Sequence, residues 1–294
     1  MLKTYLGPIY LTLAASIWGG MYVVSKVVLT IIPPLELVWL RYIVAFITLG
    51  IVGFLTHQSW KIEKRDIPLV LSIGFIGYFL SIWAQFAGTQ LSSAQMGSVI
   101  TSATPAFMVL FARIILKETI TFRKGLSVCL ATIGVLCIVG VGDLNSSSQL
   151  GGIILGIAAL TWALMSVLVK KVPAHYSQLV ITTYAAIVAM VTMTPLAVSQ
   201  SVLLNDLSLL SDPIIWGGIL YLGVVSTAGA FFFWNKGLQL VDAAQAGLYF
   251  FFQPLVGTLL GWLFLGEQVG LSFWLGAALI MAGVFLVIEK RGQA

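Results

Sequence analysis

Charged residues are scarce in this chain. Only 9% of its 294 residues are Asp, Glu, Lys or Arg, whereas 60% are hydrophobic and the mean hydropathy is +1.05. A soluble domain of this composition would not have enough polar side chains to cover its surface. The composition therefore excludes a soluble protein and predicts an integral membrane protein.

Cysteine and histidine, the usual residues of metal and redox sites, number two each. Cys129 and Cys137 lie in one apolar segment with no nearby histidine, so they predict neither a metal site nor a disulfide. His57 and His175 fall in connections, and no G-x-x-x-x-G-K-S/T loop for ATP is present. We expect no enzyme activity, no metal and no cofactor.

Carboxylates are missing from one place in particular. None of the ten Asp and Glu residues falls at the middle of an apolar segment. A proton-coupled carrier of cationic drugs usually has a buried carboxylate there, because that group neutralises the cation and exchanges it for a proton. The absence favours neutral, zwitterionic or anionic small solutes.

The sequence does contain ten apolar segments, each close to the roughly 20 residues that span a hydrocarbon core. They cover residues 6–28, 34–55, 67–87, 94–116, 123–141, 151–172, 178–198, 214–238, 243–265 and 271–288. We therefore expect an all-α integral membrane protein with ten transmembrane helices, folded as a single membrane domain over residues 1–294. No soluble domain is expected between them.

The chain also repeats itself. Repeat one covers residues 3–142 and repeat two residues 150–290, and each contains five segments. Because five is odd, the second repeat must cross the membrane in the opposite sense, which predicts a 5+5 inverted repeat. Matched residues are Gly7, Trp18, Met21 and Lys26 with Gly151, Trp162, Met165 and Lys170, and Gly74, Gly88, Pro105, Glu118 and Gly134 with Gly223, Gly237, Pro254, Glu267 and Gly283.

The basic residues indicate the orientation. If both termini are cytoplasmic, 13 of the 15 Lys and Arg residues lie on the inner side, as the positive-inside rule requires. Because these residues are scattered over helix ends, they do not form a nucleic-acid-binding module. The expected partners are the lipid bilayer and a small-molecule substrate, with no nucleic acid.

Matched residues also meet at one depth. Trp18 and Pro105 lie at the middle of the first and fourth segments, and Trp162 and Pro254 at the middle of the sixth and ninth. A proline inside a helix removes a donor and frees a carbonyl one turn earlier, which is tolerated in a membrane where it is buried in protein or lines a cavity. Interrupted helices at matching repeat positions indicate a central substrate site.

Polar residues near these four positions complete the predicted site, although a Ser or Thr there also fits a hydrogen bond between helices. Arg41 is the strongest intramembrane charge. It has three candidate roles: pairing with Glu36, which we favour, neutralising a substrate carboxylate, or bonding a neighbouring helix end. The predicted substrate-binding residues are Trp18, Tyr22, Arg41, Tyr78, Ser98, Thr101, Pro105, Trp162, Thr227, Tyr249, Gln253 and Pro254.

Two further matched sets have structural interpretations. Glu118 and Glu267 each precede a helix, so we expect them to complement the positive end of that next helix, with gating as the alternative. Ser127 and Gly134 match Gly276 and Gly283, and small residues let helices approach closely. We expect them to pack helices within one bundle rather than to form a dimer contact, and the protein to be a monomer or a homodimer.

These features resemble the drug/metabolite transporter superfamily in its ten-helix EamA form. The resemblance rests on Ala14-Ala15-Ser16-Ile17-Trp18-Gly19-Gly20 through Lys26, on Leu40-Arg41-Tyr42, and on the two copies that contain Pro105…Glu118…Gly134 and Pro254…Glu267…Gly283. It implies a carrier with a central cavity between two halves that alternates between inward-open and outward-open states.

Members of this superfamily move amino acids, nucleobases, sugar phosphates, toxic metabolites and drugs, many of them as exporters. The expected function is therefore secondary or facilitative transport, as an exporter, of small polar metabolites such as amino acids across a bacterial inner membrane. The alternatives are a drug or toxic-compound efflux carrier and a passive channel.

Overall fold

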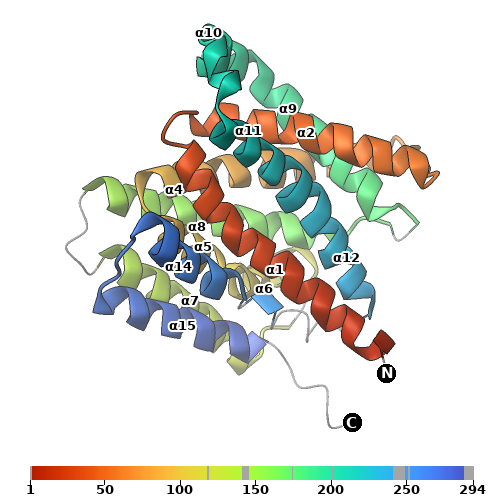
Figure 1. Cartoon of the computed structure of the whole chain (residues 1–294). Helices are drawn as coiled ribbons and strands as arrows, with labels where there is room; N and C mark the ends of the chain where they lie inside the picture. The colour runs from red at the N-terminus through yellow and green to blue at the C-terminus, as the bar shows by residue number, and fades with distance from the viewer. Residues whose placement is uncertain are drawn as a thin grey trace.

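The structure is a computed structural model that describes residues 2–117, 119–140, 146–173, 175–199, 201–240, 249–250 and 252–287. All regular elements within these residues are helical (Figure 1). Among the described residues, seven helices are long and apolar enough to cross a membrane, and the shorter helices Phe252–Leu265 and Leu271–Gly283 are also apolar. The all-α membrane class is confirmed. The predicted starts and ends at residues 141, 243 and 288, and Glu118, lie outside the described residues.

Four of the seven candidate spans among the described residues lie in the first half. Its elements are α1 (Leu2–Val28), α2 (Pro34–Leu55), α3 (Ile67–Ile73), η1 (Gly74–Ser81), α4 (Ile82–Leu91), α5 (Ala94–Thr101), α6 (Thr104–Ile115) and α7 (Phe122–Gly140).

The second half follows the same order, with an additional short helical connection after its second span. Its elements are α8 (Ser146–Val169), α9 (Gln178–Ser199), α10 (Val202–Asn205), η2 (Leu207–Ser211), α11 (Pro213–Leu220), η3 (Tyr221–Gly229), α12 (Ala230–Leu240), α14 (Phe252–Leu265) and α15 (Leu271–Val287).

Two of the spans contain a π-helical segment at matching repeat positions. These segments are η1 and η3, and Gly74 in η1 is the repeat partner of Gly223 in η3. A π turn leaves backbone groups without their usual α-helical partners, and such turns often occur at functional sites. Side chains from other helices bind these backbone groups: Tyr42 Oη donates to Tyr78 O at 2.8 Å, and Trp18 Nε1 donates to Ser226 O at 3.1 Å.

The predicted proline interruptions have a different form from the one expected. α5 ends at Thr101 and α6 begins at Thr104, so Pro105 stands in the first turn of a new helix. Proline is favoured there because its missing N–H would have no partner anyway. The carbonyl of Thr101 accepts a hydrogen bond from Thr104 Oγ1 at 2.7 Å. Pro254 similarly lies in the first turn of α14.

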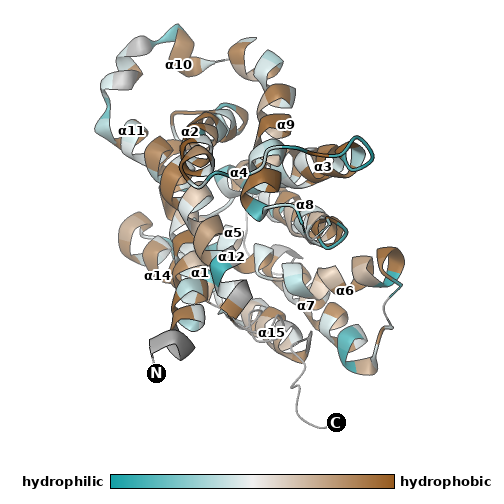
Figure 2. Cartoon of the chain, turned by 90° about the vertical axis from the view of Figure 1, so that its right-hand side faces the viewer, coloured by the Kyte–Doolittle hydropathy of each residue, from teal (hydrophilic) through white to brown (hydrophobic). Residues whose placement is uncertain are grey.

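The helices form two sets, and repeat-related residues make the same kind of contact within each set. A Cβ added to Gly88 of α4 would lie 2.7 Å from Leu155 Cγ of α8, and one added to Gly237 of α12 would lie 2.6 Å from Leu11 Cγ of α1. These are repeat-related pairs. Accordingly α1 packs on α12 and α14, and α8 packs on α4 and α6 (Figures 1 and 2). α2 contacts the first group through η3, and α9 contacts the second group through η1. We call the first group, with α2 and η3, the α1 set, and the second group, with α9 and η1, the α8 set.

The last helices of the two repeats, α7 and α15, pack closely along their length. A Cβ on Gly134 would lie 2.6 Å from Gly276 O, and a Cβ on Gly283 would lie 2.8 Å from Ser127 O. The four small residues therefore allow the two backbones to approach each other. Their predicted role in packing within the bundle is confirmed.

Candidate functional site

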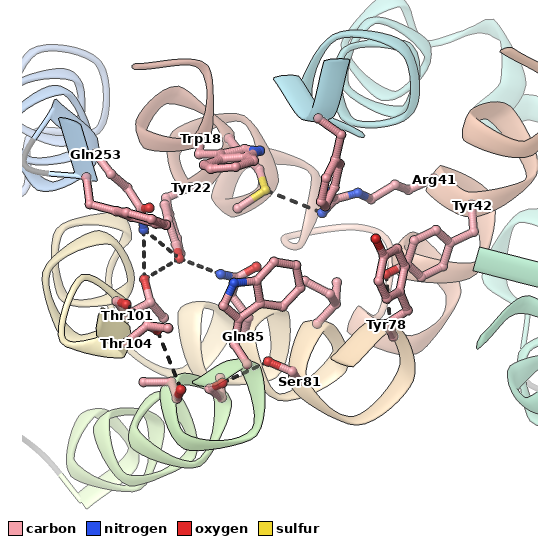
Figure 3. A pocket seen from close by; sticks show the side chains of 17 residues that line it. Trp18, Tyr22, Arg41, Tyr42, Tyr78, Ser81, Gln85, Thr101, Thr104 and Gln253 are labelled. Atoms are coloured by element: carbon pink, nitrogen blue, oxygen red, sulfur yellow. Dashed lines mark hydrogen bonds between the residues drawn. The ribbon is translucent and has the colours of Figure 1, made fainter. Parts of the chain in front are cut away.

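A cavity lies between the α1 set and the α8 set (Figure 3). Residues from both repeats contribute to it, and they include seven of the twelve predicted substrate-binding residues. Those seven are Trp18, Tyr22, Arg41, Tyr78, Thr101, Trp162 and Gln253.

Aromatic rings from both repeats form one wall of the cavity. Phe231 of α12 lies at its centre, with its ring centroid 6.0 Å from that of Tyr78, 6.3 Å from that of Trp162 and 5.7 Å from that of Trp18. Tyr78 and Phe231 are stacked, with 20° between their planes. These separations fall within the range for favourable aromatic pairs. The wall suits an apolar or planar part of a ligand.

A hydrogen-bonded group of four side chains closes another side of the cavity. Thr101 Oγ1 donates its proton to Gly97 O at 2.7 Å, so in the contact between Tyr22 and Thr101 it must be Tyr22 that donates. Gln253 Nε2 donates to Thr101 Oγ1 at 2.9 Å, and Gln85 Nε2 donates to Tyr22 Oη. The group joins α1 and α14 to α4 and α5, and thus the two helix sets.

Arg41 is the one charged side chain among the described residues that line the cavity. It extends from α2 and is only 2% exposed. Its Nε donates to Thr227 Oγ1 at 2.6 Å, its Nη1 contacts Met21 Sδ at 3.3 Å, and its Cζ lies 5.4 Å from the centroid of the Phe86 ring. All of these partners are neutral. Within the described part of the chain, no carboxylate pairs with this cation.

The favoured pairing of Arg41 with Glu36 is wrong. The Glu36 carboxylate instead binds the start of α10: it accepts hydrogen bonds from the N–H groups of Val202 and Leu203, at 2.9 and 3.1 Å, and from the Ser201 hydroxyl. A helix N-terminus attracts a carboxylate because its first N–H groups have no partner within the helix. The role of Arg41 must therefore be sought in the cavity.

Five predicted site residues do not line the cavity. Ser98 packs against Gly257 where α5 meets α14, and Thr227 binds Arg41 from behind while donating to Leu222 O at 2.7 Å. Pro105 and Pro254 begin helices, and their neighbours Thr104 and Gln253 line the cavity instead. The Tyr249 ring stacks on that of Phe252, with centroids 6.5 Å apart.

The cavity also contains residues outside the twelve predicted substrate-binding residues. Ser81 and Gln85 follow Tyr78 at helical spacing, and this polar stripe in an apolar span was a usable signal. Ala158 and Ala159 contribute only small methyl side chains to the lining, and alanine is too common in apolar helices to indicate a site from sequence. The additional lining residues are Met21, Tyr42, Ser81, Ile82, Gln85, Thr104, Ala158, Ala159, Phe231 and Phe250.

Glu267 caps a different helix from the one predicted. Its carboxylate was expected at the start of α15, but it accepts hydrogen bonds from Ala94 N at 2.7 Å and Gln95 N at 3.0 Å, at the start of α5. The capping principle holds, but the recipient is an N-terminus brought close by the fold. Sequence order could not indicate that neighbour.

No cluster of His, Cys, Asp or Glu side chains within the described ranges could hold a metal ion. The arrangement is that of a binding site. A helical membrane protein in which two sets of helices, each drawn from both repeats, enclose an aromatic and polar cavity belongs to the class of solute transporters. The chain belongs to the EamA-like transporter family, whose profile matches residues 5–140 and again residues 149–289. Its place in the drug/metabolite transporter superfamily is thereby confirmed.

Relatives support this assignment. The uncharacterized transporter YetK of Bacillus subtilis strain 168 is 25% identical over 293 residues, which cover 97% of this chain and 88% of YetK. An uncharacterized transporter of Archaeoglobus fulgidus is 25% identical and covers 96% of this chain, with 99% of its own length aligned. YdzE of Bacillus subtilis strain 168, named as a permease-like protein, is 64% identical over 72 residues, which cover 24% of this chain and 92% of YdzE.

A solved crystal structure shows the same fold. It superposes with a TM-score of 0.63 at 19% sequence identity, covering 97% of this chain and 95% of its own. Family membership and the apolar helices together make the chain a multi-pass transporter of the bacterial inner membrane.

Proposed function

We propose that this protein exports small polar metabolites, such as amino acids, by alternating access of the central cavity to the two sides of the membrane. Transport is secondary or facilitative. The observation that carries the proposal is the cavity itself, which lies between two repeat-related helix sets and is lined by residues of both. Movement of one set relative to the other would open it to each side in turn.

The proposed topology has ten spans as a 5+5 inverted repeat, with both termini cytoplasmic. Contacts between connections support it. On the expected inner side, Tyr176 Oη donates to Asp66 Oδ2 at 2.9 Å, and Glu63 N donates to Tyr176 Oη at 3.0 Å. On the expected outer side, Glu36 binds the start of α10. Connections that the distribution of basic residues assigns to the same side of the membrane are therefore in contact with each other.

The charge of the cavity favours polar metabolites over cationic drugs. Its described lining includes Arg41 and contains no Asp or Glu. A drug cation would face an uncompensated positive charge in a medium of low polarity, which costs binding energy. Drug efflux therefore remains the second candidate, and a passive channel the third.

Transport by purified protein in sealed vesicles tests the proposal. The compound would be chosen by comparing metabolites inside and outside cells with and without the chain. We expect saturable flux of that compound, stimulated by unlabelled compound on the opposite side. Flux that rises without saturation would contradict a carrier and support a channel, and absence of flux above that of protein-free vesicles would contradict transport of that compound.

A further inference from the structure

Arg41 has hydrogen-bonding capacity that the described residues do not use. Its guanidinium carries five N–H donors, and the hydrogen bonds of the structure use two of them, towards Thr227 Oγ1 and Met21 Sδ. Thioethers are weak acceptors. A cation that is 2% exposed and has no carboxylate partner among the described residues is costly to bury in a membrane. An anionic ligand in the cavity would offset that cost.

Gln85 has an unused acceptor in the same cavity. Because Thr101 donates to Gly97 and Tyr22 donates to Thr101, Tyr22 Oη can only accept from the amide of Gln85. The amide nitrogen of Gln85 is thereby fixed towards Tyr22, and its oxygen must point the other way. That oxygen, Oε1, is buried and has no hydrogen-bond partner among the described residues. It can accept a proton donor from a ligand.

The two side chains have different positions in the cavity. Figure 3 shows Arg41 on one side, Tyr22, Thr101 and Gln253 on the other, and Gln85 extending between them. A ligand that bridges Arg41 and Gln85 needs an acceptor anion at one end and a donor at the other. The aromatic wall of Tyr78, Phe231 and Trp162 is available to the rest of the molecule.

We infer that Arg41 and Gln85 form a two-point site for a small carboxylate that also carries a hydrogen-bond donor, such as an ammonium group. Arg41 binds the carboxylate, and Gln85 Oε1 accepts from the donor. Charge-assisted hydrogen bonds of this kind are stronger than neutral ones, and a planar guanidinium matches a carboxylate in shape. This inference rests on the proposed function and identifies the substrate class of its cavity.

The test measures binding of defined probes to the purified full-length protein in detergent, by calorimetry. Alanine, leucine and phenylalanine are each compared with their amides, which lack the carboxylate, and with their deaminated acids, which lack the donor. For at least one side chain we expect the amino acid to bind tenfold or more tightly than both analogues. Equal binding of the amide and the amino acid, or no binding of any probe, would overturn the inference.

Variants assign the two contacts. Arg41→Gln should remove the preference for acid over amide, whereas Arg41→Lys should weaken binding but keep that preference, since it retains a positive charge. Gln85→Leu should reduce the preference for the amino acid over the deaminated acid and leave the acid-to-amide ratio unchanged. If Arg41 only supports the fold, its variants will lower stability while both ratios stay as in the wild type, which would contradict the inference.

The substrate class and the transporter function can fail separately. Saturable vesicle flux of a compound without a carboxylate would overturn the substrate class while supporting transport. Tight binding of the amino acids without any flux or counterflow would contradict the proposed function and leave the two-point site in place.

Discussion

Lys26 and Glu267 bind the two ends of a single turn, the one that joins α4 to α5. Lys26 Nζ donates to the carbonyls of Thr89, Gln90 and Ser92 at 2.9, 2.7 and 2.6 Å, where α4 ends. Glu267 accepts from two N–H groups where α5 begins. A cation thus lies at a helix C-terminus and an anion at a helix N-terminus, the favourable arrangement for both helix dipoles.

These contacts join α1, and the connection that follows α14, to the turn between α4 and α5 at one end of the cavity. We expect Lys26→Met and Glu267→Gln to open that end. In a background with Cys129→Ser and Cys137→Ser, Ile82→Cys places a thiol on the cavity lining. A membrane-impermeant maleimide supplied only on the Lys26 side should label it several-fold faster in either variant.

Lys170 provides the matched control for this experiment. It is the repeat partner of Lys26, but its side chain is exposed. Lys170→Met should therefore leave labelling from the Lys26 side unchanged. Equal labelling rates in the wild type, Lys26→Met and Glu267→Gln would show that these contacts do not control access to the cavity.

Thr227 should contribute to stability through Arg41. Thr227→Val removes the acceptor of Arg41 Nε and leaves a buried charged donor without its partner, a change that costs about 1–3 kcal/mol. Thr227→Ser keeps the hydroxyl and should cost much less. Denaturant unfolding in detergent micelles would measure both variants. Equal free energies of unfolding for the two would show that the hydroxyl does not support Arg41.

The sequence predicted the fold well because its signals are local or repeated. Segment hydropathy indicated the spans, and matched residues such as Gly134 and Gly283 predicted helix packing that the structure contains. Seven predicted site residues line the cavity, because the prolines and tryptophans correctly indicated the depth of the site along the helices. Depth along a helix follows from counting residues, since each adds about 1.5 Å.

Neighbours across the fold could not be predicted in the same way. Glu36 and Glu267 were each assigned to the nearest charge or helix in the sequence, but both bind helix starts brought close by tertiary packing. The π-helical segments η1 and η3 also escaped prediction, because no residue type marks an added backbone residue in a helix. Thr227 was consequently placed in the cavity, although it lies behind Arg41.

The aromatic wall should be required for transport but not for membrane insertion. Trp162→Ala and Trp18→Ala each remove a ring that contacts Phe231 and should reduce saturable flux at least tenfold, because an aromatic contact with a ligand is lost. Trp162→Phe retains a ring and should keep most of the flux. Expression and elution volume would verify folding, and unchanged kinetics in both alanine variants would exclude these rings from the substrate path.

Close packing of α7 on α15 predicts a strong dependence on side-chain size. A Cβ at Gly134 would lie 2.6 Å from a backbone oxygen, and at Gly283 2.8 Å from another, so neither neighbour can move away as a flexible side chain could. Forcing added atoms into such a contact costs typically about 1–3 kcal/mol, and we expect Gly134→Val and Gly283→Val to lower the free energy of unfolding by at least that amount. Gly217→Val is the matched control, because nothing lies within 4 Å of a Cβ at this position in α11. A Gly-to-Val change has the same helix-propensity cost at all three positions. A lower free energy of unfolding for the Gly134 and Gly283 variants alone would therefore assign the effect to the α7–α15 contact. Equal decreases for all three variants would contradict that assignment.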